Sequence, residues 1–441
     1  MNLLLISFTF PPSGGVGVLR ALSLAKYLPE HGVRVDVLSA RNAPAVGKDP
    51  HLLQQIPDSV TLHSCWTLDL PFAVRKGFKR LLAGKGSVAA PAATGTGPAA
   101  AGGGGLLRRI KQAVGNLLLP DPQIGWLPFA LPAARRIIRS RAIDAVVITV
   151  PPFSSTALVG KLRAEFPDLP IFLDFRDEWL TTTLDLVMFN KNDKARSVAR
   201  QFEAEAVRAA TGVVMVTEAA QREIRNRYPQ LDPGRVHCIP NGFDMTPKPP
   251  AVPTNNGTTV LTYLGSVYGS TDPTVFVEAV LGLPEAVRSR LRVRFIGRIE
   301  TAAYREALQQ LGETVELRGF MPQAEALRAM EDTTYVLLIT RDPINVSAKF
   351  YDYLGGGKPI LAAVHPQGDV RQLLEQTRAG WWADGSDVDA VRALLTQAVE
   401  RQPRLQQEFQ PDPSRIAQYH RRPLAQRYAA LLRQSREGTT S

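Results

Sequence analysis

The chain has 441 residues, of which 44% are hydrophobic and 21% charged. This composition excludes a disordered or fibrous protein, and the length predicts two domains because one hydrophobic core rarely serves so many residues. No apolar run approaches the roughly 18 to 20 residues of a membrane span, and residues 1–10 lack the basic start and cleavage site of a signal peptide. We therefore expect a cytoplasmic protein. Only two cysteines are present, far apart in the sequence, which argues against a disulfide framework or a zinc site.

The formal net charge is +11 with a pI near 9.8, which indicates an acidic partner such as a phosphate ligand, an anionic lipid or nucleic acid. Between Leu70 and Asp121 the charged residues are all basic: Arg75, Lys76, Lys79, Arg80, Lys85, Arg108, Arg109 and Lys111. They alternate with apolar residues at helical spacing, so the segments near 75–111 favour contact with a membrane surface over a solvated basic loop. No aromatic platform accompanies them, which disfavours nucleic acid.

The first half of the chain predicts a parallel sheet. Residues 3–7 form an apolar run, a loop with Gly14, Gly15 and Gly17 follows, and an apolar helical stripe then ends at Gly32. Residues 34–40 read as a second strand, so the chain opens with a strand, helix and strand in parallel arrangement. Further strands are predicted at 145–150, 171–175, 212–216 and 235–239, with a helix at 198–210. We predict a first doubly wound domain over residues 1–245.

A flexible insertion interrupts this domain at about 73–115, because residues 86–105 are almost entirely Ala, Gly, Pro, Ser and Thr. The Pro- and Asn-containing stretch 244–256 has the composition of an interdomain linker. Apolar runs at 258–264, 292–296, 315–317, 335–340 and 360–364 then predict a second parallel sheet over residues 246–412. We expect a helix at 416–433, within a tail of residues 413–441, to pack back on the first domain. The predicted fold class is α/β, with two Rossmann-like doubly wound domains.

Residues 345–364 predict a short helix between two apolar strands, a common setting for anion binding. Ser347 stands at the expected N-cap, and three glycines end the helix. Lys349 and Asp352 are three residues apart and share one helical face. A cation beside a helix N-terminus suits a diphosphate, and a carboxylate one turn later suits sugar hydroxyls. The pattern favours a nucleotide-sugar site, although an ordinary helix with a surface lysine explains the spacing equally well.

Two further groups of residues are candidates for ligand binding in the first domain. The glycines of the first loop let backbone amides approach a phosphate or a sugar, unless they serve only a tight turn. Arg20, one turn into the next helix, either supplies charge to the same place or is an ordinary surface arginine. Four charged residues crowd the end of the strand at 171–175, namely Asp174, Arg176, Asp177 and Glu178. We assign Arg176 and Asp177 to acceptor binding, with a structural ion pair as the alternative.

Six motifs occur in order along the chain: FPPSGGVG at 10–17, PPFSS at 151–155, DFRDEW at 174–179, IPNGFD at 239–244, YLGS at 263–266 and SAKFYDYLGGGKP at 347–359. As an ordered set they resemble the GT-B glycosyltransferases of the retaining family 4 type, also called glycosyltransferase group 1. The resemblance covers nearly the whole chain except about 73–115. It implies two Rossmann-like domains with a cleft between them, the first holding the acceptor and the second the nucleotide-sugar.

The resemblance also assigns roles in the second domain. It implies that Lys349 and Arg298 hold the donor diphosphate, and that Asp352, the second acid of the Glu-x7-Glu motif, binds the nucleotide ribose. The family's first acid is replaced by Ile344. The family places a basic residue after the first strand of this domain, but Gly265 and Ser266 begin a loop without Arg or Lys, so we expect Arg298 or backbone amides to take that role. The segment with Gly319 and Phe320 resembles the lining of the base pocket, and a simple strand-end turn explains it as well.

The implied reaction is a hexosyl transfer with retention that needs no protein nucleophile. The leaving diphosphate takes the acceptor proton, while Lys349 and Arg298 stabilise its charge and Asp177 acts on the acceptor side. The family's usual His position holds Pro151 and Pro152, so no catalytic His is carried over. No Asp-x-Asp motif has supporting ligands, and we expect no metal and no cofactor.

The basic insertion predicts a lipid-linked or saccharide acceptor in cell-surface polysaccharide or glycolipid assembly, with the protein peripheral on the inner face of the membrane. Two alternatives remain from the sequence: a nucleotide-sugar epimerase of the same fold, and a catalytically silent sugar-nucleotide or membrane-binding module. Turnover of a nucleotide-sugar with and without an acceptor separates the three.

Overall fold

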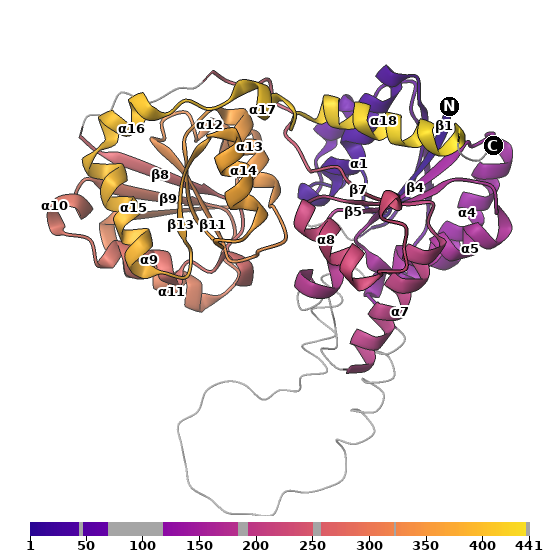
Figure 1. Ribbon diagram of the computed structural model, residues 1–441, viewed down its shortest axis with the longest axis horizontal. Helices are drawn as coiled ribbons and strands as arrows, with labels where there is room; N and C mark the ends of the chain where they lie inside the picture. The colour runs from indigo at the N-terminus through magenta and orange to yellow at the C-terminus, as the bar shows by residue number, and fades with distance from the viewer. Residues whose placement is uncertain (44–46, 69–117, 184–192, 250–256, 322, 438–441) are drawn as a thin grey trace, which may run out of the picture. The chain divides into compact units, whose positions relative to one another are not determined.

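A computed structural model of the chain describes residues 1–43, 47–68, 118–183, 193–249, 257–321 and 323–437 (Figure 1). The predicted flexible insertion at about 73–115, including the basic segments near 75–111, lies outside the described residues. The chain folds into two compact units. The first comprises residues 1–214, 230–235 and 429–441, and the second comprises 215–229 and 236–428. The functional division at residues 245 and 412 stays a prediction.

The first sheet has seven strands in the order β3-β2-β1-β4-β5-β6-β7. The pairs from β3 through β6 are parallel. The order reverses between β1 and β4, as in doubly wound folds, and ligands of such sheets bind beyond the carboxyl ends of the strands. The strands are β1 Asn2–Ser7, β2 Arg34–Ala40, β3 Thr61–Cys65, β4 Ala145–Val150, β5 Ile171–Phe175, β6 Gly212–Met215 and β7 Val236–Cys238.

Helices connect these strands. They are α1 Val16–Tyr27, α4 Leu127–Ser140, α5 Ala157–Glu165, α7 Asp193–Ala209 and α8 Glu218–Arg227. Short 3₁₀ turns are η1 Leu28–His31, η2 Pro50–Gln55, η3 Pro122–Trp126, η4 Phe153–Thr156 and η6 Pro233–Arg235, and η5 Trp179–Thr183 is a π-type turn. The apolar stripe after the glycine loop therefore folds as α1 followed by η1, and Gly32 ends it with φ 70°.

The second sheet has six strands, all parallel, in the order β10-β9-β8-β11-β12-β13. This is the order of the first six strands of the N-terminal sheet, so both sheets have the predicted Rossmann-like topology. The strands are β8 Thr259–Leu264, β9 Leu291–Ile296, β10 Val315–Gly319, β11 Tyr335–Thr340, β12 Ile360–Val364 and β13 Gly380–Asp384.

The helices of the second half follow the strands in turn. They are α9 Thr274–Leu281, α10 Glu285–Arg288, α11 Ala302–Gln309, α12 Gln323–Arg328, α13 Ala348–Gly356, α14 Asp369–Thr377, α15 Val388–Glu400, α16 Gln402–Glu408, α17 Pro413–Ala417 and α18 Arg421–Glu437, with 3₁₀ turns η7 Gly269–Thr271 and η8 Gly312–Thr314. The single helix expected at 416–433 is thus two helices, α17 and α18. Within the first unit, the end of α18 is held by Arg433, which donates to the carbonyl of His31.

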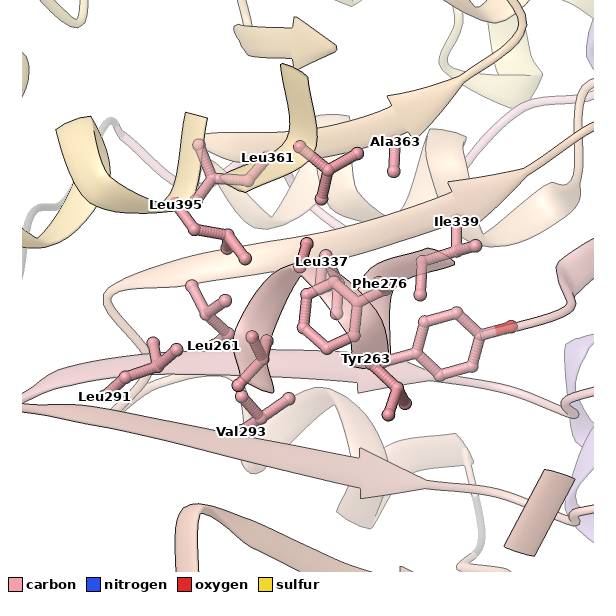
Figure 2. Close-up of a cluster of buried hydrophobic side chains, with 14 of the residues drawn as sticks. Leu261, Tyr263, Phe276, Leu291, Val293, Leu337, Ile339, Leu361, Ala363 and Leu395 are labelled. Carbon is pink, nitrogen blue, oxygen red and sulfur yellow. The ribbon is translucent and has the colours of Figure 1, made fainter. Parts of the chain in front are cut away.

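Alternating side chains of the second sheet fill two apolar layers. Leu337 and Ile339 of β11 belong to the layer that contains residues of α9 and α15, and Figure 2 shows this layer. Val336 and Leu338, pointing the other way, belong to the layer that contains residues of α13 and α14. Burial of each such side chain contributes about 1.5–3 kcal/mol to stability. Because these central strands are buried on both faces, every position favours an apolar residue, and a continuous apolar run predicts them well.

Candidate functional site

Three strand-end turns of the second unit pack together without intervening side chains. The N–H of Gly265, after β8, donates to the carbonyl of Ile296 at 2.8 Å, and the N–H of Gly297, after β9, donates to the carbonyl of Gly319 at 2.7 Å. Gly297 has φ 150°, and a Cβ there would lie 2.0 Å from the carbonyl oxygen of Gly265. Only glycine fits this position. At the carboxyl ends of β8, β9 and β10 the backbones of these turns are therefore in direct contact.

Lys349 brings a cation to these turns from the first turn of α13. Its Nζ donates to the Tyr263 hydroxyl at 2.5 Å and lies 4.0 Å from the centre of that ring. A Cβ on Gly265 would lie 3.2 Å from the same Nζ. The Tyr263 hydroxyl in turn donates to the carbonyl of Ser266 at 2.9 Å. Figure 2 shows this hydroxyl pointing away from the apolar cluster. Lys349, Gly265 and Ser266 are thus brought together, and their role in donor binding stays a prediction.

The electrostatics of Lys349 favour an anionic ligand. Burial lowers the pKa of Lys349 to about 8, so the side chain is mostly charged at pH 7. Burial also raises the pKa of Tyr263, which keeps that phenol neutral. No carboxylate among the described residues forms an ion pair with Lys349. Within the described ranges, its contacts with the Tyr263 hydroxyl and ring leave the positive charge of this half-buried cation without a neutralising carboxylate.

No side chain caps the first backbone N–H groups of α13, which is what an anion site requires. Ser347 occupies the N-cap position as predicted, but its side chain makes no capping hydrogen bond. The first amides of a helix have no partner within the helix, so those of α13 can face a ligand. The helix ends at Gly357, with φ 67°, and includes the first two of the three glycines expected to stop it. Asp352 follows Lys349 on the same helix and is half-buried.

The loop before α13 contains an interaction that the sequence did not reveal. Asp342 Oδ1 accepts hydrogen bonds from the N–H groups of Ile344 and Asn345, at 2.8 and 2.9 Å. The carboxylate nearest to the missing first acid of the motif therefore holds its own loop. Ile344 itself is buried, with 7% of its surface exposed.

Arg298 lies against Phe320, with its guanidinium carbon 4.9 Å from the ring centre. Phe320 follows Gly319 at the end of β10 and is 67% exposed. The predicted second cation and the predicted base-pocket residue are therefore neighbours. An exposed aromatic ring beside an arginine provides a flat surface on which a planar group can stack.

In the first unit, Arg20 binds Asp174 rather than extending into the glycine loop. Its Nε and Nη2 donate to the Asp174 carboxylate at 2.7–3.0 Å, and both side chains are buried. These residues are 154 positions apart, and their pairing joins α1 to the end of β5. Arg20 is therefore not the ordinary surface arginine that the sequence left as an alternative, and its contribution to a phosphate site stays a prediction.

The other crowded charges at the end of β5 have separate environments. Arg176 is buried, and it donates through Nε to the carbonyl of Val150 and through Nη2 to that of Pro151. Glu178 is fully buried and accepts from the N–H groups of Leu180 and Thr181. Asp177 is exposed. The sequence gives no sign of the backbone hydrogen bonds of Glu178, and the assignment of Arg176 and Asp177 to acceptor binding stays a prediction.

Gly14, Gly15 and Gly17 lie at the beginning of α1. Gly15 is the N-cap residue, has φ 97° and supplies no capping side chain. The amide of Gly14 donates to the carbonyl of Gly47 at 2.9 Å, so it is used within the protein. The glycine loop therefore combines a tight turn with an uncapped helix start.

The described residues offer no metal centre and no membrane-spanning helix. No cluster of three or more His, Cys, Asp or Glu side chains in this part of the chain is arranged to hold a metal ion. Within the same ranges, no helix has the length and apolar character needed to cross a membrane. Cys65 and Cys238 are half-buried thiols rather than halves of a disulfide.

Comparison with known proteins places this architecture among sugar-transferring enzymes. Residues 14–242 match the model of the glycosyl transferase 4-like domain. Alpha-maltose-1-phosphate synthase of Mycobacterium tuberculosis is 31% identical over 150 residues, which cover 33% of this chain and 37% of that relative. The match thus spans little more than a third of the relative's length.

Solved structures resemble nearly the whole chain. Anabaena HepE in complex with UDP and glucose has a TM-score of 0.63 at 15% identity, covering 98% of this chain and 100% of that one. Sucrose-phosphate synthase from Thermosynechococcus elongatus has a TM-score of 0.60 at 13% identity, covering 98% of both chains. At these identities the likeness shows a shared fold, and it confirms the predicted GT-B class.

Proposed function

Because the chain belongs to the glycosyl transferase 4-like domain family, we propose that it transfers a glycosyl group from a nucleoside diphosphate sugar to an acceptor hydroxyl. The observation that carries the proposal is Lys349, a half-buried lysine without an ion-pair partner among the described residues. It lies at an open helix start beside the backbone turns of Gly265 and Gly297. A diphosphate supplies the missing negative charge, and the turns let it approach closely.

Each donor group has a matching protein group in the second unit. Lys349 and the first amides of α13 bind the diphosphate, and Arg298 adds a second cation. Asp352, one turn along α13, accepts hydrogen bonds from the ribose hydroxyls. Phe320, held by Arg298, offers a surface for the base. The HepE structure contains UDP and glucose, which supports a nucleoside diphosphate hexose as the donor class.

The proposed chemistry depends on stabilising the leaving group. As the bond from the sugar to the diphosphate breaks, negative charge grows on the diphosphate oxygen, and we assign its stabilisation to Lys349 and the first amides of α13. The acceptor hydroxyl oxygen bonds to the anomeric carbon on the face that the diphosphate leaves, and the leaving diphosphate oxygen takes the hydroxyl proton. No protein nucleophile is then required, and the same-face attack keeps the configuration of the sugar. We also propose that neither a metal nor a cofactor takes part, since the lysine supplies the charge that a divalent cation would provide.

We further propose that the acceptor belongs to cell-surface polysaccharide or glycolipid assembly, and that the protein acts at the inner face of a membrane. The support is the basic composition of residues 70–121, whose charged side chains are all basic apart from Asp121 itself. Basic and apolar residues in alternation suit anionic lipid headgroups.

The test is turnover of UDP-, GDP- and ADP-sugars by the full chain, with membrane lipid extract as the acceptor source. We expect one donor class to yield a glycosylated product, and Lys349→Ala to lose it. The matched control is Lys248→Ala, because Lys248 is an exposed lysine of the same unit that pairs with Glu331. Interconversion of the donor sugar without an acceptor indicates an epimerase, and binding without turnover indicates a silent module. Either result overturns the proposal.

A further inference from the structure

The outer side of α4 in the first unit carries only basic charge. The helix packs against α5 and covers part of the first sheet (Figure 1). Its buried residues are Ala130, Ala133, Ala134, Ile137 and Ile138. The opposite side presents Arg135, Arg136 and Arg139, and the sequence of the helix contains no acidic residue. Solvated helix faces usually mix charges of both signs, so this arginine face has the charge of an anion-binding surface.

The three arginines surround a hollow of about 470 Å³, and Pro132 and Ser140 complete its lining. Pro132 lies one turn before Arg135 and Arg136 on the same side of the helix. Because its ring is compact, it leaves space between the longer arginine side chains. Most of the lining residues are exposed, so a ligand can enter the hollow from solvent with only its charged group.

Glu165, at the end of α5, holds two of the three guanidinium groups in place. Its Oε2 pairs with Nε of Arg135 at 2.6 Å, and its Oε1 pairs with Nη2 of Arg139 at 2.5 Å. The guanidinium carbon of Arg139 also lies 5.7 Å from the centre of the Phe166 ring. Side chains that are already fixed lose little freedom when a ligand binds, so these contacts favour binding.

One carboxylate does not neutralise three arginines. Arg136 is exposed and has no ion-pair partner within the ranges that the structure describes. Burial raises the pKa of the Cys65 thiol, and the positive charge of Arg136 is among the influences that oppose this rise. Arg139 follows Arg135 by four residues and Arg136 by three, and like charges at these spacings destabilise a helix. A bound anion would relieve this repulsion.

We propose that the arginine face of α4 binds a phosphate group, carried either by an anionic lipid headgroup or by a soluble phosphorylated molecule. A guanidinium donates two parallel N–H bonds to a phosphate, which favours arginine over lysine at such a site. The helix ends beside Asn2, at the start of β1, whereas ligands of parallel sheets bind beyond the carboxyl ends of the strands. The arginine face is therefore a site for attachment or regulation, separate from substrate binding.

The first experiment measures sedimentation of the full chain with phosphatidylcholine vesicles, with and without phosphatidic acid. If a lipid supplies the phosphate, phosphatidic acid should strengthen binding. Arg136→Gln should then weaken it about fivefold, the effect of one arginine at an anionic surface. Arg200→Gln is the matched control, because Arg200 is an exposed arginine of α7 in the same unit. Equal losses in the two variants would assign binding to overall charge and overturn the inference.

The second experiment compares melting temperatures in sodium phosphate and in sodium chloride at equal ionic strength. Every chain in this arm also carries Lys349→Ala, which removes the proposed diphosphate site. If a soluble molecule supplies the phosphate, phosphate should protect this background, and adding Arg136→Gln should abolish the protection. Adding Arg200→Gln instead should leave it unchanged, and phosphatidic acid should then recruit the chain no better than phosphatidylcholine does.

Without phosphate, Arg136→Gln should melt no lower than the wild type, because the residue is exposed and its removal relieves repulsion. Binding that depends on Arg136 with either probe supports the site and identifies the source of the phosphate. If Arg136→Gln changes neither vesicle binding nor phosphate protection, the inference fails. Neither readout involves sugar transfer, so this failure is distinguishable from failure of the proposed function.

Discussion

The affinity for a nucleoside diphosphate should fall about tenfold between pH 7 and pH 9, because Lys349 loses its proton in this range. Burial lowers the pKa of Lys349 to about 8. With that pKa, about nine-tenths of the side chain is charged at pH 7 and about one-tenth at pH 9. If only the charged form binds the diphosphate, affinity follows this fraction. The affinity falls, rather than rises, with increasing pH because the lowered pKa of Lys349 means that its positive charge is lost as pH rises through 8. Bound diphosphate raises the pKa again, so binding above pH 8 takes up a proton.

The assay is calorimetric titration with UDP at constant ionic strength from pH 7 to 9, in buffers of different ionisation enthalpy. The phosphate groups of UDP are about nine-tenths ionised at pH 7 and more fully above it, because their last pKa lies near 6, so their titration does not lower the affinity as pH rises. Lys349→Arg is the matched control, because a guanidinium remains charged throughout and should give a flat profile. A wild-type affinity that is constant over these two pH units would refute the assigned role of Lys349. An equal decline in Lys349→Arg would assign the titration to another group.

Three further predictions concern packing, the buried ion pair and metal. Gly297→Ala should lower the free energy of unfolding by about 3 kcal/mol or more in chemical denaturation, because its Cβ would meet the Gly265 carbonyl at 2.0 Å. Gly269→Ala, where a Cβ meets open space, is the control and should be nearly neutral. Equal losses of stability in the two variants would contradict the packing described. Asp174→Asn should cost about 3–5 kcal/mol, since it removes the carboxylate charge that pairs with the buried Arg20 guanidinium. A loss below about 1 kcal/mol would contradict a buried ion pair at this position. Transferase activity should be unchanged by EDTA, and a loss restored by Mg²⁺ or Mn²⁺ would show that a metal is required.

The sequence predicted most accurately those strands whose position is determined by one local property, a continuous run of apolar residues. Continuous apolar runs identified β4, β5, β11 and β12 to the residue, because central strands of a parallel sheet are buried on both faces. The strands β3 and β13 were missed. Both lie at sheet edges, and their side chains are only partly buried, so no apolar run marks them.

The sequence indicated candidate residues for the site but not the contacts between them. The position of Lys349 on a helix start follows from local spacing, whereas its hydrogen bond to Tyr263 joins residues 86 positions apart. The contact between Gly297 and Gly265 depends on how two strand ends meet in space. Arg20 read as a candidate phosphate ligand because its partner, Asp174, is far away in the sequence. Such long-range pairs follow from topology and packing rather than from any short pattern.

The most direct test of the account is a crystal structure of the full chain with the nucleoside diphosphate that binds it best. The account predicts diphosphate oxygens within hydrogen-bonding distance of Lys349 Nζ and of the first amides of α13, with the chain approaching closely at Gly265. A diphosphate bound elsewhere, with Lys349 still directed only to Tyr263, would contradict the central claim.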